Sequence, residues 1–386
     1  MKDLDQARKA IDDIDRQLIA ALAARMKLVS SVAAIKSDDP DVPLRNDERE
    51  REVFDAWALE GQKFGLSPYF LGRILREVLN YSRRDQESLL GSGITPEAPS
   101  SVRVAYQGAP SSYSDLSIEK LFISRSTSVR ERIGLHSFKA ALDALEASEV
   151  EYALLPIENT IAGSIVEVHR LLAERQVHIV DEEYWLVEHV LAGLHGSSVE
   201  SLKVIRSHPV ALQQCEQFTG SLVGCRAESY YDTAASAHSV VEAGDPTIGA
   251  ICSEQAALRA GLTILQREIA DRTHNTTRFV LLALNPEPVD ARIAAKISLL
   301  FTADHRRGAL AACLQNFADE EINLCKLESR NLTDSPWEYL FHVDIEGNLE
   351  DPRLTSALKK LEEHTNYLRV LGCYPNRTAQ ESEWGR

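Results

Sequence analysis

Apolar residues at the start of the chain recur at the spacing of an α-helix. Leu4, Ile11 and Leu18 repeat every seven residues, and the polar residues between them form a second, charged face. A Ser-Pro step at residues 67–68 supplies the N-cap and first position of a further helix. The pattern predicts an all-α segment of three helices, over residues 3–37, 45–64 and 67–90.

From Val102 onward the spacing changes, and short apolar runs alternate with helical stretches. The predicted strands are VRVAY, YALLPI, VHIVDEEY, LKVIRS, TIGAIC and RFVLLAL. The predicted helices lie at about residues 114–124, 137–147, 163–175, 208–219, 231–242 and 253–260. Alternation of this kind is typical of an α/β architecture with mainly parallel sheets.

The last segment has a different order of elements. It is predicted to be strand, helix, strand, strand, helix, strand, over residues 296–302, 308–319, 322–330, 338–345, 351–364 and 367–373. This βαββαβ order is that of a ferredoxin-like α+β fold. We therefore expect a helical domain, a linker, an α/β domain, a linker, an α+β domain and a frayed tail, at residues 1–90, 91–101, 102–284, 285–295, 296–376 and 377–386.

Composition narrows the class of ligand. The 386 residues include 42 Lys+Arg and 58 Asp+Glu, a net charge of −16, so nucleic acid and anionic membranes are poor partners. The polar start MKDLDQARKA is unlike a secretory signal, and no apolar run is expected to span a membrane. Six scattered cysteines without a C-x-x-C spacing predict free thiols in a reducing cytoplasm and no zinc site.

Two cations interrupt the apolar face of the first helix. Arg25 and Lys36 each stand seven residues beyond an apolar member of a row. They lie about 20° apart around the helix and roughly 16 Å apart along it, so both side chains can lean toward one small dianion. Arg8 lies roughly 25 Å from Arg25. It either forms a helical pair with Asp12 or reaches the equivalent ligand of a partner chain packed antiparallel.

These cations belong to a larger pattern on three successive helices. The pattern consists of Arg8, Arg25, Lys36, Arg49, Glu50, Ser82 and Gln86. It resembles the all-helical chorismate mutase family over essentially all of residues 1–90. The resemblance implies a rearrangement of chorismate to prephenate that needs no cofactor or metal, in an active site shared across an intertwined homodimer. Catalysis then consists of holding a compact conformer and stabilising charge on the ether oxygen.

The same resemblance assigns roles to these residues. Arg8 of the partner and Arg25 hold carboxylates, and Lys36 and Gln86 donate to the ether oxygen. The remaining substrate-binding residues are Asn46, Arg49, Glu50 and Ser82, with Glu50 at the substrate hydroxyl. Asn46 stands where the family often has an acidic residue. Without the resemblance, the run RNDERERE would be a solvated helical face.

Three polar strings lie at strand ends in the α/β segment. They are PIEN at residues 156–159, SHPVALQQ at 207–214 and NTTRF at 275–279. Ligands of open α/β sheets bind beyond the carboxyl ends of strands, so a cleft between two lobes would collect all three. Each string also has a structural interpretation, as turn residues, a helix N-terminal carboxylate, a capping histidine or a solvated arginine.

Together the three strings resemble prephenate dehydratase over residues 102–284, with two α/β lobes like those of periplasmic-type binding proteins. The implied reaction converts prephenate to phenylpyruvate, CO2 and water. It implies that Thr277 acts at the leaving hydroxyl, with Glu158 or water supplying the proton. Arg278 would bind a carboxylate. The other cleft residues would be Asn159, Thr160, Ser207, His208 and Gln214. Two departures from the family are Ser111, where a glycine is usual, and Val210.

The C-terminal segment resembles the ACT regulatory domain of bifunctional prephenate dehydratases. The strings RRGALAACL at residues 306–314 and CKLESRN at 325–331 match the two stretches that bind phenylalanine in that family. The implied allosteric residues are Gly308, Ala309, Leu310, Glu328, Ser329 and Arg330. Ala311 and Asn331 depart from the family. Phenylalanine would be a feedback inhibitor; the alternative is a purely structural dimerisation module.

The resemblances leave two further alternatives open. The dehydratase could prefer arogenate to prephenate. Alternatively, the two-lobed segment and its C-terminal domain could form a non-catalytic, amino-acid-responsive binding protein, although Thr277 and Arg278 argue against that.

Overall fold

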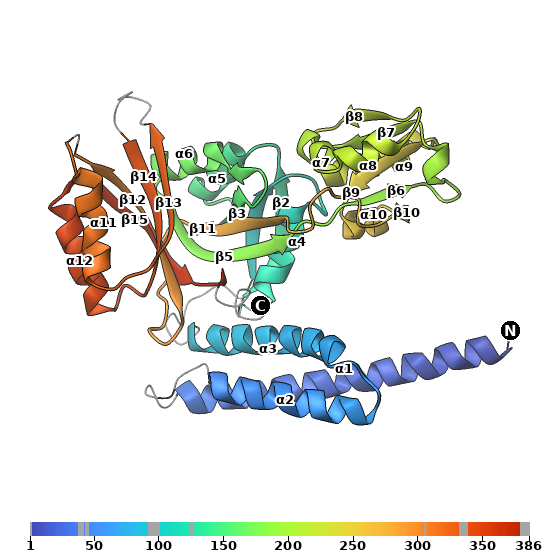
Figure 1. Cartoon of the computed structure of the whole chain (residues 1–386), viewed down its shortest axis with the longest axis horizontal. Helices are drawn as coiled ribbons and strands as arrows, with labels where there is room; N and C mark the ends of the chain where they lie inside the picture. Colours follow the sequence, from blue (N-terminus) through green and yellow to red (C-terminus); the bar gives the residue numbers. More distant parts are fainter. Residues whose placement is uncertain are drawn as a thin grey trace. The chain divides into compact units, whose positions relative to one another are not determined.

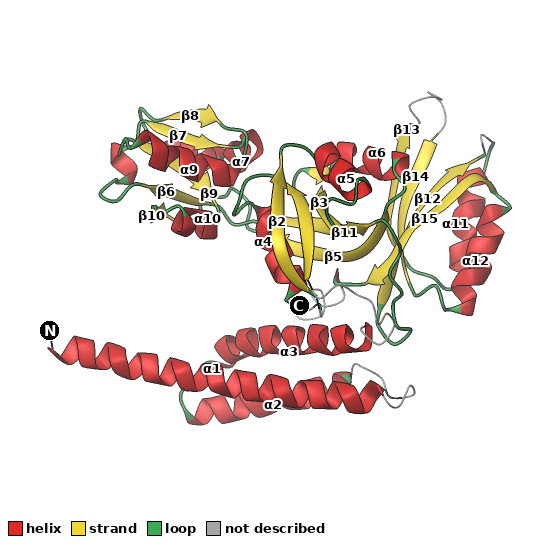
Figure 2. Ribbon diagram, turned by 180° about the vertical axis from the view of Figure 1, so that it is seen from behind, coloured by secondary structure: helices red, strands yellow, loops and turns green. Residues whose placement is uncertain are grey.

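The computed structural model describes residues 2–37, 42, 46–91, 101–123, 125, 127–304, 306–331 and 339–378. The chain divides into two compact units, one made by about the first hundred residues and one by nearly all of the rest. Figure 1 shows the elements in chain order, and Figure 2 shows that helices alone build the first unit. The predicted linker at residues 91–101 lies almost entirely outside the described residues.

The described part of the first unit holds three helices, as the apolar pattern predicted. They are α1 (Lys2–Ser37), α2 (Asp47–Lys63) and α3 (Pro68–Gly91). Asn46 begins α2 as its N-cap, because its side-chain oxygen accepts a hydrogen bond from the backbone N–H of Arg49 at 2.9 Å. Ala33 of α1 and Leu75 of α3 are among the buried residues that hold the helices together.

Much of the apolar face of α1 is exposed within this unit. Leu4, Ile11 and Leu18 are 56%, 59% and 57% exposed. No apolar run was expected to span a membrane, but by length and composition the segment Leu4–Lys36 could cross one, because few charges interrupt its later half. An unpartnered apolar face equally suits packing on another helix.

The first lobe of the second unit is a mixed sheet with the order β2-β1-β3-β11-β5, with the short β4 beside β3. Its strands are β1 (Ser101–Gln107), β2 (Ser128–Leu135), β3 (Tyr152–Asn159), β4 (Gly163–Ser164), β5 (His178–Leu186) and β11 (Thr276–Ala283). Its helices are α4 (Tyr113–Phe122), α5 (Phe138–Glu146) and α6 (Val166–Glu174). Strands β1, β2 and β3 pair in parallel, whereas β11 runs antiparallel between β3 and β5.

The second lobe is a smaller sheet with the order β10-β6-β9-β7-β8. Its strands are β6 (Val190–Gly193), β7 (Val204–Ser207), β8 (Arg226–Ser229), β9 (Ile248–Cys252) and β10 (Thr263–Gln266). Its helices are η1 (Val199–Ser201), α7 (Pro209–Gln214), α8 (Glu216–Ser221), α9 (Thr233–Ala243) and α10 (Glu254–Arg259). Antiparallel pairing of β6 with β9 and β10 shows that the sheets are less parallel than predicted.

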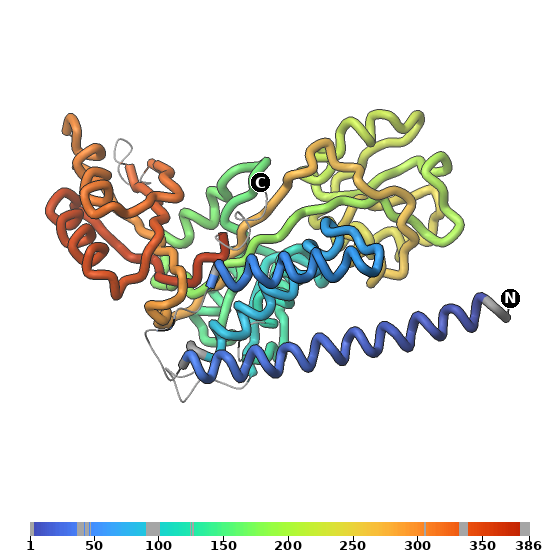
Figure 3. Tube along the Cα trace, turned by 60° about the horizontal axis from the view of Figure 1, so that its bottom comes forward, coloured from blue at the N-terminus to red at the C-terminus, as the bar shows by residue number. Residues whose placement is uncertain are grey.

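The chain crosses between the lobes twice, after β5 and before β11, and Figure 3 shows the two crossings. They are joined to each other, because the Val187 N–H donates to the Asn275 carbonyl at 2.6 Å. The return crossing explains the antiparallel β11: the strand re-enters the first lobe from the second and runs back along its sheet. The polar strings at strand ends are therefore collected near the crossings.

The last part of the chain forms a third sheet with the order β13-β14-β12-β15, which is the ferredoxin-like arrangement predicted. Its elements are β12 (Ala295–Ala303), α11 (Ala309–Asp319), β13 (Leu324–Asn331), β14 (Tyr339–Glu346), α12 (Pro352–Glu362) and β15 (Thr365–Pro375). Both helices cover one face, as Figure 1 shows, and Leu299, Phe301 and Phe317 are buried between helices and sheet.

The third sheet packs against the first lobe. A Cβ atom at Gly372 of β15 would lie 2.0 Å from the Ile179 carbonyl oxygen of β5, so this approach requires glycine. Arg377, predicted to begin a frayed tail, is instead 5% exposed, and its Nε donates to Asp181 at 3.1 Å. Residues 379–386 lie outside the described part of the chain.

Candidate active sites

In the helical unit, Arg25 of α1 contacts Ser82 of α3. Arg25 Nη1 donates to Ser82 Oγ at 2.5 Å, and Ser82 is buried. Burial lowers the pKa of the Arg25 guanidinium. A desolvated cation on an otherwise apolar helix face suits an anionic ligand.

Lys36 and Glu50 form a second polar group of this unit. Burial lowers the pKa of Lys36, while the charge of Glu50 opposes that shift. Glu50 also lies 3.3 Å from Arg83 Nε, and both side chains are 12% exposed. The sequence patterns did not point to Arg83, which sits beside the predicted Ser82. Gln86 lies half-buried one helical turn beyond Ser82 on α3.

Three predicted residues of the helical unit lie in other surroundings. Arg8 is exposed and pairs with Asp5 at 3.7 Å, instead of with Asp12. Arg49 is exposed and its Nη1 lies 2.7 Å from Glu52. Asn46 acts as the cap of α2. Within one chain, these residues are not gathered with Arg25 and Ser82.

In the two-lobed region, Thr277 at the start of β11 contacts Asn159 at the end of β3. Asn159 Nδ2 donates to Thr277 Oγ1 at 2.9 Å and to Asn275 Oδ1 at 2.7 Å. Thr160 joins the same two segments, since its hydroxyl accepts from the Thr276 N–H at 2.9 Å. The strings PIEN and NTTRF therefore meet, as expected from strand ends that share one edge.

A chain of amide groups continues from this point to the first crossing. Asn275 Nδ2 donates to Gln214 Oε1 at 3.0 Å, and His189 Nε2 lies 2.9 Å from the same oxygen. Asn275 and His189 are 1% and 3% exposed. Burial lowers the pKa of His189, although the bond to Gln214 opposes the shift. Sequence reasoning missed both residues; the Asn275 at the head of NTTRF was visible but was treated as a turn residue.

The second lobe contributes a half-buried carboxyl group that sequence reasoning also missed. Asp232 caps α9 by accepting from the Ala235 N–H at 2.9 Å, and burial raises its pKa. A Cβ atom at Gly108 of the first lobe would lie 3.1 Å from Asp232 Oδ2. In the same loop Ser111 adopts φ 68°, a conformation that glycine takes readily, which accounts for the family's usual glycine there.

Ser207 and His208 do not point as predicted. Ser207 is fully buried and donates to the Ile251 carbonyl at 2.6 Å. Its hydroxyl is therefore hydrogen-bonded within the second lobe and does not point toward a ligand as predicted. His208 is half-buried and caps α7, where its Nδ1 accepts from the Val210 N–H at 3.3 Å. Burial lowers the pKa of His208, and the nearby Asp232 opposes that shift.

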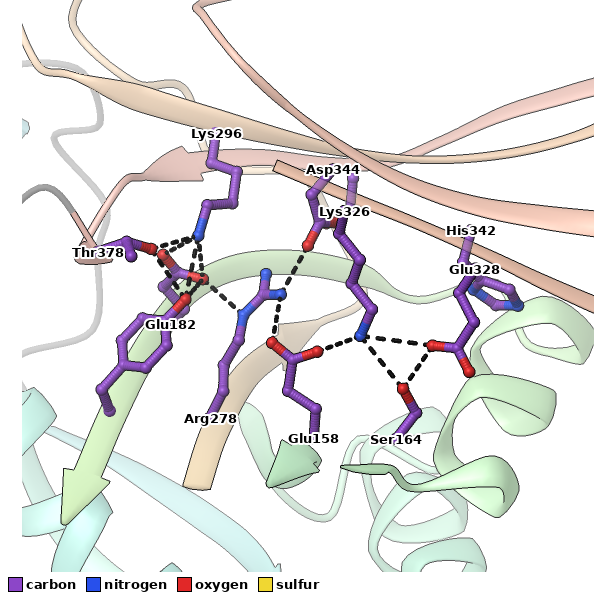
Figure 4. Close-up of polar contacts among 12 residues, drawn as sticks. Glu158, Ser164, Glu182, Arg278, Lys296, Lys326, Glu328, His342, Asp344 and Thr378 are labelled. Carbon is purple, nitrogen blue, oxygen red and sulfur yellow. Dashed lines mark hydrogen bonds and ion pairs between the residues drawn. The ribbon is translucent and has the colours of Figure 1, made fainter. Parts of the chain in front are cut away.

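Arg278 is the clearest departure from the predicted site (Figure 4). Its Nε donates to Glu182 at 2.8 Å and Nη1 donates to Asp344 at 2.6 Å. Its Nη2 donates to Tyr374 Oη at 2.8 Å. Burial alone would lower its pKa, but Tyr374, Asp344 and Glu182 raise the pKa well above its usual value. Arg278 is 3% exposed, so the predicted contact with a substrate carboxylate is not the role that the fold gives it.

Glu158 lies on the same side as Arg278. Its carboxylate pairs with Lys326 of β13 and lies 3.5 Å from Arg278 Nη1 (Figure 4). Successive side chains alternate across a strand, so Glu158 and Arg278 face the third sheet while Asn159 and Thr277 face the other way. Glu158 is therefore engaged by Lys326 and Arg278 on the face opposite Thr277, away from the hydroxyl that the predicted acid role would serve.

The predicted phenylalanine-binding residues lie at the start of α11 and along β13. Gly308 caps α11 with φ 79°, Ala309 is buried, and Leu310 follows on the helix. Glu328 accepts from Ser164 of the first lobe and pairs with Arg330, and Ser329 lies between them on β13.

Beside Glu328, two buried imidazoles meet, His169 of α6 and His342 of β14, with Nδ1 atoms 3.1 Å apart. Among the described residues, no group of His, Cys, Asp and Glu suits a metal ion.

The comparisons with known proteins agree with both predicted activities. The family model of chorismate mutase type II matches residues 7–87, and that of prephenate dehydratase matches residues 104–287. The bifunctional chorismate mutase/prephenate dehydratase of Enterobacter agglomerans is 31% identical over 379 residues, covering 98% of this chain and 97% of that protein. The chain belongs to the bifunctional chorismate mutase/prephenate dehydratase family.

Two further relatives of this bifunctional family member cover about seven tenths of the chain. Arogenate dehydratase/prephenate dehydratase 1 of Arabidopsis thaliana is 37% identical over 290 residues, which is 72% of each chain. The crystal structure of prephenate dehydratase from Arthrobacter aurescens in complex with L-Phe is 26% identical, with a TM-score of 0.63, and covers 71% of this chain and 90% of that one.

Proposed function

We propose that the cleft of this bifunctional enzyme presents the Thr277 hydroxyl as the donor to the departing hydroxyl of prephenate. The observation that carries the proposal is the bond from Asn159 Nδ2 to Thr277 Oγ1. Because Thr277 Oγ1 accepts this bond, its own hydrogen is available to a ligand. Among the described residues, none accepts a hydrogen bond from this hydroxyl.

Beyond this donor, the reaction needs few catalytic groups from the protein. As the ring carboxylate leaves as CO2, the electrons of the broken C–C bond enter the ring. The hydroxyl leaves from the opposite position as hydroxide, which takes one proton from solvent to become water. Aromatisation supplies the driving force, so a positioned donor at the leaving oxygen stabilises the charge that develops there. Arg278 and Glu158 are then positioning residues, and Asn159, Thr160 and Gln214 hold the donor and the ligand.

For the mutase reaction we propose Lys36 and Gln86 as donors to the ether oxygen and Arg25 as a carboxylate ligand. The exposed apolar row of α1 supports a homodimer in which the partner's α1 covers this face. Such packing would bring Arg8, which is exposed in one chain, to the site of the other. Arg49, Glu50, Ser82 and Asn46 complete the proposed set. If the partner's α1 covers this apolar face, the helix need not lie in a membrane. We therefore propose a cytoplasmic location for the enzyme.

For residues 296–376 we propose an ACT domain that senses phenylalanine. The Arthrobacter aurescens prephenate dehydratase, solved in complex with L-Phe, covers 71% of this chain, which supports the proposal. The bonds from β13 to Glu158 and Ser164 give a bound ligand a way to act on the cleft. The domain limits 1–90, 102–284 and 296–376, with linkers between them, remain part of this proposal.

The test is a product analysis with chorismate alone. We expect prephenate to appear transiently and phenylpyruvate to accumulate. The variant Thr277→Val should convert chorismate to prephenate at the normal rate and stop there, whereas Thr277→Ser should retain most of the second step. Phenylpyruvate formation at a normal rate by Thr277→Val would overturn the role of Thr277. No turnover of chorismate or prephenate by the unaltered chain would favour a non-catalytic binding protein.

Arogenate is the second candidate substrate, because the Arabidopsis thaliana relative is named for both dehydratase reactions. Arogenate carries an amino group where prephenate carries a keto group, at the far end of the side chain from the leaving hydroxyl. A comparison of kcat/KM for the two compounds decides between them. A higher kcat/KM for arogenate would reassign the physiological substrate and leave the role of Thr277 unchanged.

A further inference from the structure

The hydrogen bonds that link the amide side chains between Thr277 and His189 have a fixed donor-to-acceptor direction, which two backbone N–H groups determine. Asn159 Oδ1 accepts hydrogen bonds from the backbone N–H groups of Ile161 and Ala162, at 2.9 and 2.8 Å. A backbone N–H can only donate, so the oxygen of the Asn159 amide must face these two groups. Its Nδ2 therefore faces Thr277 and Asn275, and it has one hydrogen for each.

The direction then passes to the next two residues. Asn275 receives a hydrogen from Asn159, so its oxygen faces Asn159 and its Nδ2 faces Gln214. Gln214 must accept this bond through Oε1. The same oxygen lies 2.9 Å from His189 Nε2, which must then carry the hydrogen. Burial lowers the pKa of His189 and favours a neutral ring, and Tyr113 Oη, which donates to the Glu188 carbonyl at 2.6 Å, lies near the other ring nitrogen.

Two donors are left over at the ends of this chain. Thr277 keeps its hydroxyl hydrogen, as argued above, and Gln214 keeps both hydrogens of Nε2. Thr277 and Gln214 are each partly exposed, and neither of these groups has a bonded acceptor among the described residues. Both ends of the chain can therefore offer hydrogen to an oxygen-rich anion such as prephenate.

We infer that His189 and Asn275 are positioning residues that orient the Asn159 and Gln214 amides so that Thr277 and Gln214 both donate into the cleft. Neither residue need touch the substrate. Their effect is to exclude the alternative arrangement, in which Gln214 would present its oxygen to an anionic ligand. This inference rests on the proposed function of Thr277 and adds two residues to it.

The first test is Asn275→Asp, which preserves shape. The introduced carboxylate still accepts from Asn159, but it cannot donate to Gln214, whose amide should then turn. We expect kcat/KM for prephenate to fall by about tenfold or more at neutral pH. Protonation of the carboxyl restores a donor, so activity relative to the unaltered enzyme should recover as pH falls. The uncatalysed conversion of prephenate is measured in parallel and subtracted.

Two controls separate the loss of the hydrogen-bond donor at residue 275 from loss of the side chain and from charge repulsion. Asn275→Ala has no group to protonate, so its deficit should stay constant over the same pH range. Molar salt screens repulsion between a carboxylate and prephenate but cannot supply a donor, so salt should not rescue Asn275→Asp at neutral pH. Equal deficits of the Asp and Ala variants at every pH, or full rescue by salt, would overturn the inference.

The second test uses His189. Gln can place an N–H near the position of His189 Nε2, so His189→Gln should stay within about threefold of the unaltered enzyme, while His189→Leu should lose about tenfold or more. Denaturant unfolding of the same samples shows whether the unit that contains His189 is intact in each variant. Equal losses in His189→Gln and His189→Leu would contradict the inference.

The two proposals fail in different ways. If Thr277→Val keeps its dehydratase rate, the proposed function of Thr277 is wrong whatever the other variants do. If Thr277→Val is inactive but Asn275→Asp is as active as the unaltered enzyme, Thr277 stands and the positioning role of Asn275 is wrong.

Discussion

Thr277 and Arg278 are neighbours in the chain, yet their side chains serve opposite faces of β11. Thr277 accepts a hydrogen bond from Asn159, whereas Arg278 is held by Glu182 and Asp344 beneath the third sheet. The pair thus joins the proposed catalytic cleft to the C-terminal part of the chain through one peptide bond. Substitutions of Thr277 and of Arg278 should therefore have different effects, although the two residues are adjacent.

Substitution of Arg278 should affect stability more than substrate binding. Arg278→Leu leaves the buried Asp344 carboxylate without its paired cation and leaves Glu182 with Lys296 alone, and we expect the free energy of unfolding to fall by about 3–5 kcal/mol. KM for prephenate in the folded fraction should change little. Denaturant unfolding and steady-state kinetics check this. Arg170→Leu is the matched control, because Arg170 is exposed and its pair with Glu174 is worth about 0.5 kcal/mol at most. A large rise in KM with unchanged stability would restore the predicted carboxylate contact.

Substitution of Lys36 should abolish one activity and spare the other. Lys36→Ala removes the proposed donor to the ether oxygen, so kcat for chorismate should fall by about a hundredfold or more. Turnover of added prephenate by the same sample should be unchanged and serves as the internal control. Lys27→Ala is a matched surface variant, since Lys27 is an exposed cation of the same helix. Mutase turnover that survives in Lys36→Ala would show that the proposed helical site is misplaced.

Complementation tests whether Arg8 acts in the partner chain. Arg8→Ala and Lys36→Ala homodimers should each have little mutase activity. After subunit exchange, half of the dimers are mixed, and each mixed dimer has one site free of both substitutions if Arg8 crosses to the partner. Activity should therefore return to roughly a quarter of the unaltered level. No recovery, although exchange is verified with a tagged chain, would place Arg8 in its own chain's site or outside any site.

How far the sequence predicts this molecule depends on the kind of contact. The helices and the βαββαβ order follow from apolar periodicity, and the meeting of Asn159 with Thr277 follows from strand ends at one edge. The sequence could not show that Arg278 and Glu158 turn to the third sheet, because their partners Asp344 and Lys326 stand roughly 70 to 170 positions away. Nor could it show that the Ser207 hydroxyl donates its hydrogen bond to the Ile251 carbonyl.

The buried imidazoles of His169 and His342 predict acid sensitivity of folding. Burial holds the pKa of both rings below its usual value. As pH falls below about 6.5, the unfolded chain binds these protons before the folded one, so stability is lost by up to about 1.4 kcal/mol per pH unit and ring. His342→Gln should flatten the decline, and His195→Gln, at an exposed histidine, should not. The charged groups around the pair are Glu328, Lys326, Arg330 and Asp344.

Denaturant midpoints measured at intervals between pH 7 and pH 4 check this prediction. Carboxylates that are paired in the folded state lose stability in the same direction at lower pH, so the comparison is between variants and not between pH values alone. Parallel declines for the unaltered chain, His342→Gln and His195→Gln would show that the imidazole pair makes no contribution.

The ion pair of Lys326 with Glu158 should couple phenylalanine to the dehydratase cleft. Lys326 lies on β13, among the proposed phenylalanine-binding residues, and Glu158 precedes Asn159 on β3. If the ligand shifts β13, this pair transmits the shift to the strand end that orients Thr277. Coupling between two sites typically amounts to 1–3 kcal/mol. Lys326→Met should therefore keep kcat within about threefold but weaken inhibition by phenylalanine by roughly fivefold or more.

Binding and inhibition must be measured separately to show coupling. Calorimetry should find phenylalanine still bound by Lys326→Met, and because coupling is reciprocal, prephenate should lose its effect on phenylalanine affinity by the same factor. Lys360→Met is the matched control, since Lys360 is exposed and pairs with Glu320 within the same sheet-and-helix domain. Unaltered inhibition in Lys326→Met would exclude this pair as the route. If the unaltered chain binds no phenylalanine at millimolar levels, the sensing role itself fails, and the pair of Lys326 and Glu158 is a structural contact between domains.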